Sequence, residues 1–370
     1  MKQGGLMIMA GGTGGHVFPA LAVANSLKER GVTVRWMGTR RGLESRVVPS
    51  SGIPIDWIAI EGLRGKSRLS LMLAPIKLVR AVWQSIQILR SHKPEVVLGM
   101  GGFVAGPGGL AAWLVRVPLV IHEQNAVAGL TNRYLAKLAT RVLSGFPQPR
   151  DLPTNTQWVG NPVRAEFSQT QIKTKSKAKS TAADTPINVL VIGGSQGALS
   201  FNRKLPRVFA ACEQKLQELG LGTLRVRHQS GRDRADEVKD IYRDLPIIDA
   251  RVDEFIEDVA GALSWADVLV CRAGAMTIAE ICAVGCASVL VPYPFSAGDH
   301  QEINAEYLVN AGAATMIKDS EIDSPTIHTM LVDLFSNQTK RQSMADQAHS
   351  LHRPDALSVV STICQEYIHA

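Results

Sequence analysis

Four short segments of the sequence combine glycine with polar side chains in a way that suits the binding of a phosphorylated ligand. The backbone N–H groups of a glycine turn that opens a helix converge on one point, where they can bind a phosphate or a diphosphate. A plain tight turn between a strand and a helix is the alternative for any one of these segments. The segments are Gly11–His16, Gly99–Gly109, Gly193–Gly197 and Arg272–Glu280.

Three side chains in or near these segments are candidates for chemistry. His16 suits a general base or a hydrogen-bond donor, and a cap of the following helix is equally open. Glu123 is the other candidate for the general base. It lies in the polar run His122–Asn125, directly after an apolar strand, where a capping cluster for the next helix is the other interpretation. Glu280 lies near a strand end, where a carboxylate commonly binds ribose hydroxyls. A surface glutamate paired with an arginine is its alternative.

Both halves of the chain open with an apolar strand, a glycine turn and a helix. The first half opens with Leu6–Ala10 and a helix from about His16 to Arg30, and the second opens with Asn188–Ile192 and a helix from about Ser200. Apolar strands that alternate with helices indicate parallel sheets covered on both faces. The sequence therefore predicts an α/β fold with two Rossmann-like domains. The other predicted strands are Thr33–Gly38, Pro54–Ile60, Glu95–Gly99, Leu119–His122, Arg141–Ser144, Arg225–Gln229, Ile248–Arg251, Asp267–Cys271 and Ala287–Pro292.

The predicted domain boundary follows residue 163, so that residues 1–163 form the first domain and residues 164–340 the second. Trp158–Arg164 is the candidate hinge, because Asn161-Pro162 favours an extended turn. Residues 169–186 lack apolar periodicity and are rich in Lys, Ser, Thr and Ala, which indicates a flexible insertion. The two parallel sheets are expected to face a cleft at the carboxyl ends of their strands, and that cleft is the expected active site.

Composition and charge narrow the class of protein further. Of 370 residues, 45% are hydrophobic and 20% are charged, which is the balance of a soluble globular chain and not of a disordered or collagen-like one. Residues 1–167 carry 20 Lys and Arg against 8 Asp and Glu, a formal charge of +12, whereas residues 168–370 carry −5. The basic half favours an anionic polymer, a phosphorylated ligand or an acidic membrane surface, with solvated surface charge as the alternative.

The most apolar region, Leu69–Leu89, is interrupted by Lys77 and Arg80, so it does not resemble a membrane span. An amphipathic helix packed on the core is the default, and a helix lying on anionic lipid is the alternative in so basic a half. The apolar N-terminal stretch is too short for a signal peptide, and five cysteines without a Cys-x-x-Cys motif fit free thiols. We therefore expect a cytoplasmic protein.

Taken together, the motifs resemble one family over nearly the whole chain. The matching strings are GGTGGHVFPALAVA at 11–24, GLRGK at 62–66, VVLGMGGFVAGPGGLAAW at 96–113, HEQNAVAGLTN at 122–132, VGNPVR at 159–164, GGSQGA at 193–198, WADVLVCRAGAMTIAE at 265–280 and DHQEINA at 299–305. They resemble the MurG glycosyltransferases, which move N-acetylglucosamine from UDP-GlcNAc to a lipid-linked muramyl-pentapeptide in bacterial cell-wall synthesis. The resemblance implies the GT-B fold, with residues 341–370 returning to the first domain, and transfer with inversion to the 4-hydroxyl of the acceptor.

The resemblance also implies roles for individual residues. Ser195 and Arg164 correspond to contacts with the donor diphosphate, Ile256 to a main-chain contact with uracil, and Gln301 to a contact with the sugar hydroxyls. Gly101 and Gly102 correspond to the site of the acceptor diphosphate. The nucleotide loop is Ala275, Met276, Thr277, Ile278, Ala279 and Glu280, with Glu280 on the ribose, and the donor contacts in the first domain are Thr13, Gly14, Gly15 and Asn125.

The implied setting is the cytoplasmic face of the inner membrane, with peripheral attachment to an anionic surface through Leu71–Trp83 and without a nucleic-acid partner. No Asp-x-Asp motif is present, so we expect neither a metal nor a cofactor, with Arg164 and the N–H groups of 195–198 stabilising the leaving diphosphate. An NAD(P)-dependent oxidoreductase is an alternative, although the G-x-G-x-x-G fingerprint is missing because its third glycine would fall on Val17. The sequence also leaves open a UDP-sugar epimerase of the same fold and a nucleotide-sugar-binding scaffold at the membrane.

Overall fold

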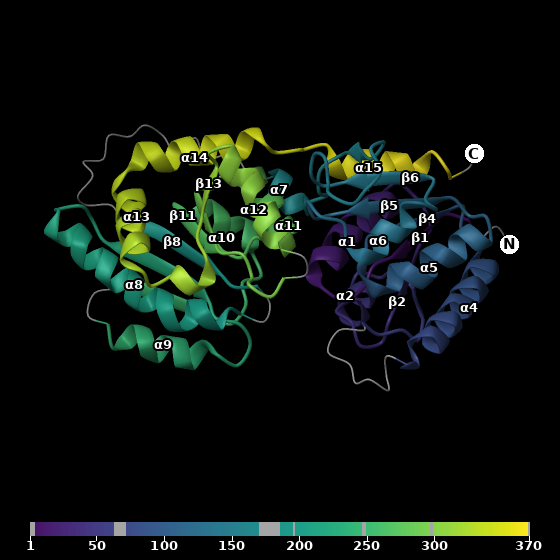
Figure 1. The fold of residues 1–370 in the computed structure, drawn as a ribbon, viewed down its shortest axis with the longest axis horizontal. Coiled ribbons are helices and arrows are strands. Elements are labelled where there is room, and N and C mark those ends of the chain that lie inside the picture. The colour runs from purple at the N-terminus through teal and green to yellow at the C-terminus, as the bar shows by residue number, and fades with distance from the viewer. Residues whose placement is uncertain are drawn as a thin grey trace. The chain divides into compact units, whose positions relative to one another are not determined.

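The computed structural model describes residues 4–62, 72–169, 186–194, 197–245, 249–296 and 299–368. The chain divides into two compact units, one of Met1–Ala165 together with Arg353–Ala370 and one of Glu166–His352 (Figure 1). Each unit is built on one sheet, and all the strand pairs described in the two sheets are parallel.

The first unit contains a seven-stranded sheet in the order β3-β2-β1-β4-β5-β6-β7. Its strands are β1 (Leu6–Met9), β2 (Val34–Gly38), β3 (Ile55–Trp57), β4 (Val96–Gly99), β5 (Leu119–Glu123), β6 (Arg141–Ser144) and β7 (Gln157–Trp158). Its helices are α1 (Gly14–Glu29), α2 (Glu44–Ser50), α4 (Ala74–His92), α5 (Gly102–Leu114), α6 (Leu130–Leu135) and α15 (Ala356–Gln365).

Helices cover both faces of this sheet because successive side chains of a strand point to opposite faces. Leu6 and Ile8 of β1 pack in a core cluster with residues of α1 and α15. Met7 and Met9 of the same strand pack in a second cluster with residues of α4 and α5. A continuous apolar strand therefore serves two cores at once.

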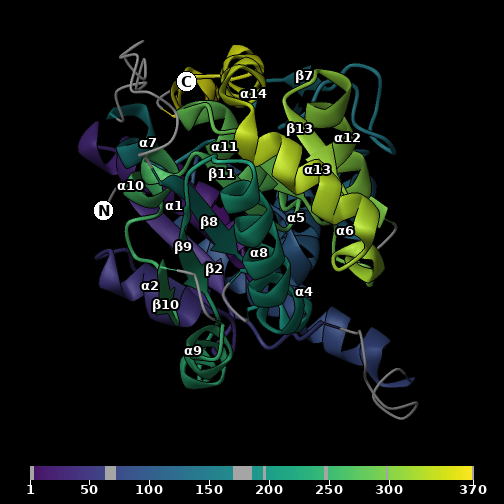
Figure 2. The same ribbon diagram turned by 90° about the vertical axis from the view of Figure 1, so that its left-hand side faces the viewer.

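The second unit contains a six-stranded sheet in the order β10-β9-β8-β11-β12-β13. Its strands are β8 (Ile187–Ile192), β9 (Leu224–Gln229), β10 (Asp249–Asp253), β11 (Val268–Cys271), β12 (Ser288–Leu290) and β13 (Ala314–Met316). Its helices are α8 (Leu199–Glu218), α9 (Ala235–Arg243), α10 (Val259–Trp265), α11 (Ala275–Val284), α12 (His300–Asn310), the 3-10 helix η2 (Asp319–Glu321), α13 (Pro325–Ser336) and α14 (Gln338–Ser350). A short helix, α7 (Ala165–Gln169), spans the boundary between the two units in the sequence. Helices α8 and α13 lie side by side (Figure 2). The rings of Phe209 on α8 and Phe335 on α13 have their centres 6.3 Å apart.

The predicted α/β class with two Rossmann-like parallel sheets is confirmed, and each predicted strand has a counterpart. Strands β7 and β13 were not predicted from the sequence. Both are short strands at the edge of a sheet, of two and three residues. Neither lies in an apolar run as long as that of residues 54–60, which predicted the similarly short β3.

The ends of the units differ from the predicted boundaries. The first unit extends to Ala165, and the chain returns to it at Arg353 and not at 341. Helix α14 packs against α11 in the second unit, whereas α15 packs against α1 in the first. The predicted insertion falls almost entirely on 170–185, outside the described residues, and the hinge and the cleft stay predictions.

Within the described ranges, no helix combines the length and the apolar composition that a membrane span requires. All five cysteines are buried free thiols.

Candidate active site

The four glycine segments lie at equivalent places in the two sheets. The strand order reverses between β1 and β4 in the first unit and between β8 and β11 in the second. Open α/β sheets bind ligands outside the carboxyl ends of their strands at such points. Each of these four strands is followed by one of the glycine segments. The topology therefore indicates a ligand site at the carboxyl ends of the strands in each of the two sheets.

In the first unit, the loop after β1 is held by a buried carboxylate that the sequence analysis missed. Glu44, at the start of α2, is fully buried, and it accepts hydrogen bonds from Gly12 N at 3.0 Å and from Thr39 N and Oγ1 at 3.0 and 2.8 Å. Gly12 has a φ of +96°, a conformation that favours glycine. Glu44 therefore fixes the turn that leads into α1.

The loops after β1 and β4 pack directly against each other. Gly102 has a φ of +78°, and a Cβ atom there would clash with the carbonyl group of Gly11. Gly101 has a φ of +90°, and a Cβ atom there would lie 2.9 Å from His16 Nδ1. The glycines of the second loop are thus required by the approach of the first loop and of the His16 ring.

Helix α1 presents free N–H groups beside these loops. Thr13 is the N-cap, but its side chain does not cap the helix. Among the described residues, none accepts a hydrogen bond from Gly14 N or Gly15 N. The guanidinium of Arg164 lies 5.9 Å from the centre of the Phe18 ring on the same helix. A helix N-terminus with a nearby cation favours an anionic ligand.

His16 is half-buried, and its Nδ1 lies 2.9 Å from Gln124 Oε1. The adjacent polar run at the carboxyl end of β5 is buried: His122, Glu123 and Gln124 are each at most 1% exposed. His122 Nε2 lies 2.9 Å from the carbonyl oxygen of Gly160. Burial lowers the pKa of His122 to about 4, so this ring is neutral at physiological pH.

Both carboxylate oxygens of Glu123 are fully engaged. Oε1 accepts from Asn125 N and from Asn125 Nδ2, each at 3.0 Å, and Oε2 accepts from Gly129 N at 3.0 Å and Asn132 Nδ2 at 2.9 Å. A buried carboxylate that accepts from four donors is held in one orientation. Its geometry suits the positioning of Asn125.

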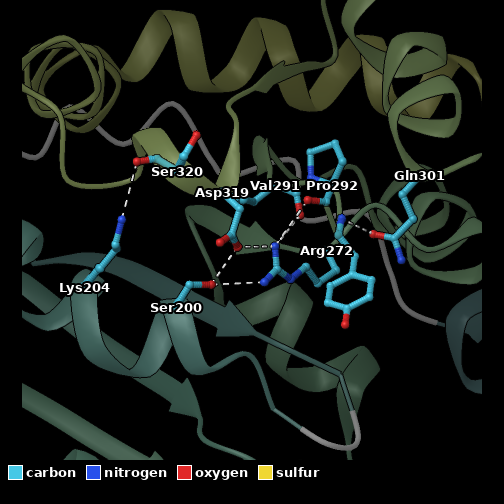
Figure 3. A network of polar contacts seen from close by, with 9 residues as sticks. Ser200, Lys204, Arg272, Val291, Pro292, Gln301, Asp319 and Ser320 are labelled. Carbon is cyan, nitrogen blue, oxygen red and sulfur yellow. Dashed lines mark hydrogen bonds and ion pairs between the residues drawn. The ribbon is translucent and has the colours of Figure 1, made fainter. Parts of the chain in front are cut away.

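In the second unit, Arg272 at the end of β11 joins four elements, as Figure 3 shows. Its Nη1 lies 2.6 Å from Asp319 Oδ1 and donates to the carbonyl oxygens of Val291 and Pro292, while Nη2 donates to Ser200 Oγ at 3.1 Å. The guanidinium also lies 4.4 Å from the centre of the Phe201 ring. Because all these partners contact one planar group, Arg272 fixes the strand ends at this edge of the sheet.

Gln301 is positioned by the same loop. Its Oε1 accepts from Tyr293 N at 2.8 Å (Figure 3), which leaves its amide nitrogen as a donor. Tyr293 also lies over the Arg272 guanidinium, at 5.6 Å from the ring centre. The carboxyl end of β12 and the start of α12 are thereby tied to Arg272.

The remaining predicted residues lie as follows. Ala275–Glu280 form the first turns of α11, whose N-cap is Gly274, and Glu280 is half-buried. Ile256 is buried and lies in the loop that follows β10. Ser195 falls outside the described residues. In the described ranges, no three His, Cys, Asp or Glu residues are grouped as they would be around a metal ion.

Glu44, Gln124 and Arg272 were not assigned roles from the sequence. Gln124 and Arg272 directly follow buried strands, and that position is a usable signal for a functional side chain. Glu44 lies 32 residues from the glycine turn that it holds, and no sequence pattern connects the two.

Residues 6–144 match the glycosyltransferase family 28 N-terminal domain, and residues 188–360 match the glycosyltransferase family 28 C-terminal domain. A crystal structure of MurG from Acinetobacter baumannii is 37% identical, covers 98% of this chain and 99% of its own, and superposes with a TM-score of 0.82. Fold, site and matches define a glycosyltransferase built from two Rossmann-like domains.

Two curated relatives are each 46% identical over 98% of this chain and 98% of their own length. Both are named UDP-N-acetylglucosamine--N-acetylmuramyl-(pentapeptide) pyrophosphoryl-undecaprenol N-acetylglucosamine transferase, and they come from Alkalilimnicola ehrlichii and Halorhodospira halophila. The chain belongs to this family, the MurG glycosyltransferases. The resemblance found in the sequence is confirmed.

Proposed function

We propose that this chain transfers N-acetylglucosamine from UDP-GlcNAc to the 4-hydroxyl of a lipid-linked N-acetylmuramyl-pentapeptide, with inversion at the anomeric carbon. The observation that carries the proposal is the 46% identity to transferases of that name along 98% of the chain. This identity disfavours the alternative functions, namely an NAD(P)-dependent oxidoreductase, a UDP-sugar epimerase and a binding scaffold, because it extends over the loops at the carboxyl ends of both sheets.

The donor binds at the sheet edge of the second unit. The first N–H groups of α11, at Ala275–Thr277, have no partner inside the helix and suit the nucleotide diphosphate. Glu280 binds the ribose, the main chain at Ile256 binds uracil, and the amide nitrogen of Gln301 donates to the sugar. Ser195 and Arg164 contact the diphosphate. Arg272 holds the loops that carry these groups in place through its contacts with Asp319 and Ser200.

The acceptor diphosphate binds at the sheet edge of the first unit. The N–H groups of Gly14 and Gly15, which have no acceptor among the described residues, form a cradle of backbone donors together with the helix start at Gly101 and Gly102. The resemblance assigns Thr13, Gly14, Gly15 and Asn125 to contacts with the donor as well, and Glu123 orients Asn125 through two hydrogen bonds.

His16 is the general base of the proposed reaction. The acceptor hydroxyl oxygen forms a bond to the anomeric carbon, its proton passes to the His16 imidazole, and UDP leaves with the electron pair of the broken bond. Glu123 is the weaker candidate, because its two oxygens already accept four hydrogen bonds. Helix N-termini and Arg164 stabilise the diphosphate charges.

Helix α4 attaches the protein peripherally to an anionic membrane surface, at the cytoplasmic face of the inner membrane. Its exposed face carries large apolar side chains with 61–69% of their surface accessible, namely Ile76, Val79 and Trp83. Lys77 and Arg80 are exposed beside them. An apolar face bordered by cations suits anionic lipid. Leu71 lies outside the described residues.

A transfer assay with UDP-GlcNAc and a short-chain lipid-linked muramyl-pentapeptide tests the proposal. Transfer is expected in the presence of EDTA, because no metal is assigned a role. His16→Ala is expected to lower kcat by about 10²-fold or more, with nearly unchanged affinity for UDP-GlcNAc. UDP binding without transfer would overturn the enzymatic function, and nearly intact turnover of His16→Ala would overturn the assignment of the base.

A further inference from the structure

A chain of four polar groups links His16 to the backbone of the segment that follows β7. It runs from His16 through Gln124 and His122 to the carbonyl oxygen of Gly160, with heavy-atom distances of 2.9, 3.2 and 2.9 Å. Gln124 and His122 are both buried, so water does not compete for these hydrogen bonds. Each proton in the chain can be assigned from its partners.

The orientation of the Gln124 amide is settled by a carbonyl group. One amide atom lies 3.1 Å from the carbonyl oxygen of His122, and only a nitrogen can donate there. The amide oxygen therefore faces His16 Nδ1 at 2.9 Å, and this nitrogen must carry a proton to donate to it. The backbone of Gln124 is held as well, because its carbonyl oxygen accepts from Asn161 Nδ2 at 3.0 Å.

The protonation of the His122 ring is settled in the same way. Nε2 faces the carbonyl oxygen of Gly160 and must be the protonated nitrogen. The ring is neutral, since burial lowers its pKa to about 4, so Nδ1 is an acceptor. It accepts the second N–H of Gln124 at 3.2 Å. Every donor in this series of hydrogen bonds has an acceptor, and no other arrangement of protons satisfies all of the donors.

We propose that Gln124 and His122 are positioning residues that hold His16 in its Nδ1–H tautomer, so that Nε2 is the basic nitrogen. The inference rests on the proposed role of His16 as the base. In the transfer step, the acceptor hydroxyl gives its proton to Nε2 while Nδ1–H stays bonded to Gln124. The backbone of Gly101 also lies against the ring, because a Cβ atom there would be 2.9 Å from Nδ1 and 3.0 Å from Cε1.

The tautomer can be read directly from the ¹⁵N chemical shifts of the imidazole nitrogens in the full-length protein. At about pH 8.5, where an ordinary imidazole is neutral, wild-type His16 is expected in the Nδ1–H form. An Nε2–H form of His16 in the wild type would overturn the inference. This measurement needs no variant, and it is independent of transferase activity.

Variants separate positioning from folding. Gln124→Met removes the three side-chain hydrogen bonds of Gln124 and is expected to shift the His16 tautomer and to lower kcat about 10²-fold, with UDP-GlcNAc affinity unchanged. Gln365→Met, which loses a hydrogen bond to Arg30 on the surface of the same unit, is the matched control and should leave both readouts unchanged. An unchanged His16 tautomer in Gln124→Met would contradict the inference.

Conservative replacement of His122 supplies a rescue test. A glutamine amide offers one donor toward Gly160 and one acceptor toward Gln124, as the neutral His122 ring does. His122→Gln is therefore expected to keep the tautomer and most of kcat, whereas His122→Leu should lose both. Equal losses in the two variants would overturn the inference. Full turnover of His16→Ala with an intact Nδ1–H tautomer in the wild type would instead reject the base and leave the tautomer assignment standing.

Discussion

The carbonyl group of Gly11 occupies the space where Gly102 would carry a side chain. These residues lie in the loops after β1 and β4, which are 91 residues apart in the chain and adjacent at the switch point of the first sheet. The two loops thus form one structure, and a disturbance of one is transmitted to the other and to His16.

Gly102→Ala is expected to destabilise the protein by about 2–4 kcal/mol, because the new methyl group meets backbone that cannot rotate away and φ is positive. Gly31→Ala is the matched control, since Gly31 has a φ of +81° with no atom near its Cβ position. It should cost only about 1–2 kcal/mol. Urea unfolding of both variants measures the difference, and equal losses would show that the contact between loops is unimportant.

Arg272→Lys is expected to raise KM for UDP-GlcNAc and to lower the free energy of unfolding by about 1–3 kcal/mol. A lysine cannot reach Asp319, Ser200 and two carbonyl oxygens at once, so the loops at the carboxyl ends of the second sheet are no longer held together. Arg225→Lys, in an exposed ion pair with Asp249, is the control and should change neither quantity. Steady-state kinetics with wild-type KM in Arg272→Lys would refute the positioning role.

Trp83→Glu is expected to weaken binding to anionic vesicles about tenfold or more, because an exposed apolar side chain on α4 is replaced by a charge of the lipid's sign. Leu219→Glu makes a comparable change on the second unit, where Leu219 is 51% exposed, and should leave binding unchanged. Sedimentation with vesicles measures both. Equal binding of the Trp83→Glu variant and the wild type would remove α4 from the membrane contact.

Glu213 on α8 is a buried carboxylate outside the active site. Its side chain is fully buried, and neither oxygen makes a well-formed hydrogen bond within the described residues. Burial raises its pKa from 4.5 to about 7. Below pH 4.5 the carboxyl group is protonated in both the folded and the unfolded protein, so it does not affect stability. As the pH rises from 4.5, the unfolded protein loses this proton first, so the free energy of unfolding falls, and the fall is complete above about pH 7.

Glu213→Gln should therefore change the free energy of unfolding, relative to wild type, in the stabilising direction by about 1–3 kcal/mol more at about pH 8 than at about pH 4.5. Glu218→Gln replaces an exposed glutamate on the same helix and should show no such pH dependence. Urea unfolding of wild type and variants at the two pH values tests this. A difference that does not change with pH would mean that Glu213 is already solvated or paired.

The fold could be predicted because its signals are local in the sequence. An apolar strand, a glycine turn and a helix are read from about twenty consecutive residues, as in Leu6–Glu29, and the parallel sheets follow from the alternation of such units. The edge strands β7 and β13 were missed because no longer apolar run surrounds them, unlike residues 54–60 around the similarly short β3. His16, Asn125 and Glu280 could be named as candidates because each lies in a segment that follows a recognisable strand, whereas Gln301 could be named only from the family resemblance.

The sequence by itself determined the class of fold, the positions of the four glycine segments and the family. Only the tertiary structure decided what each polar group does. Glu123 orients Asn125 because four donors from 125–132 converge on its oxygens. Glycine is required at 101 by the His16 ring and at 102 by the carbonyl group of Gly11. The proton arrangement around His16 depends on Gln124, His122 and Gly160, which meet only when β5 and the segment after β7 lie side by side. Hydrogen bonds depend on distance and direction, and these are properties of the folded chain that no spacing along the sequence specifies.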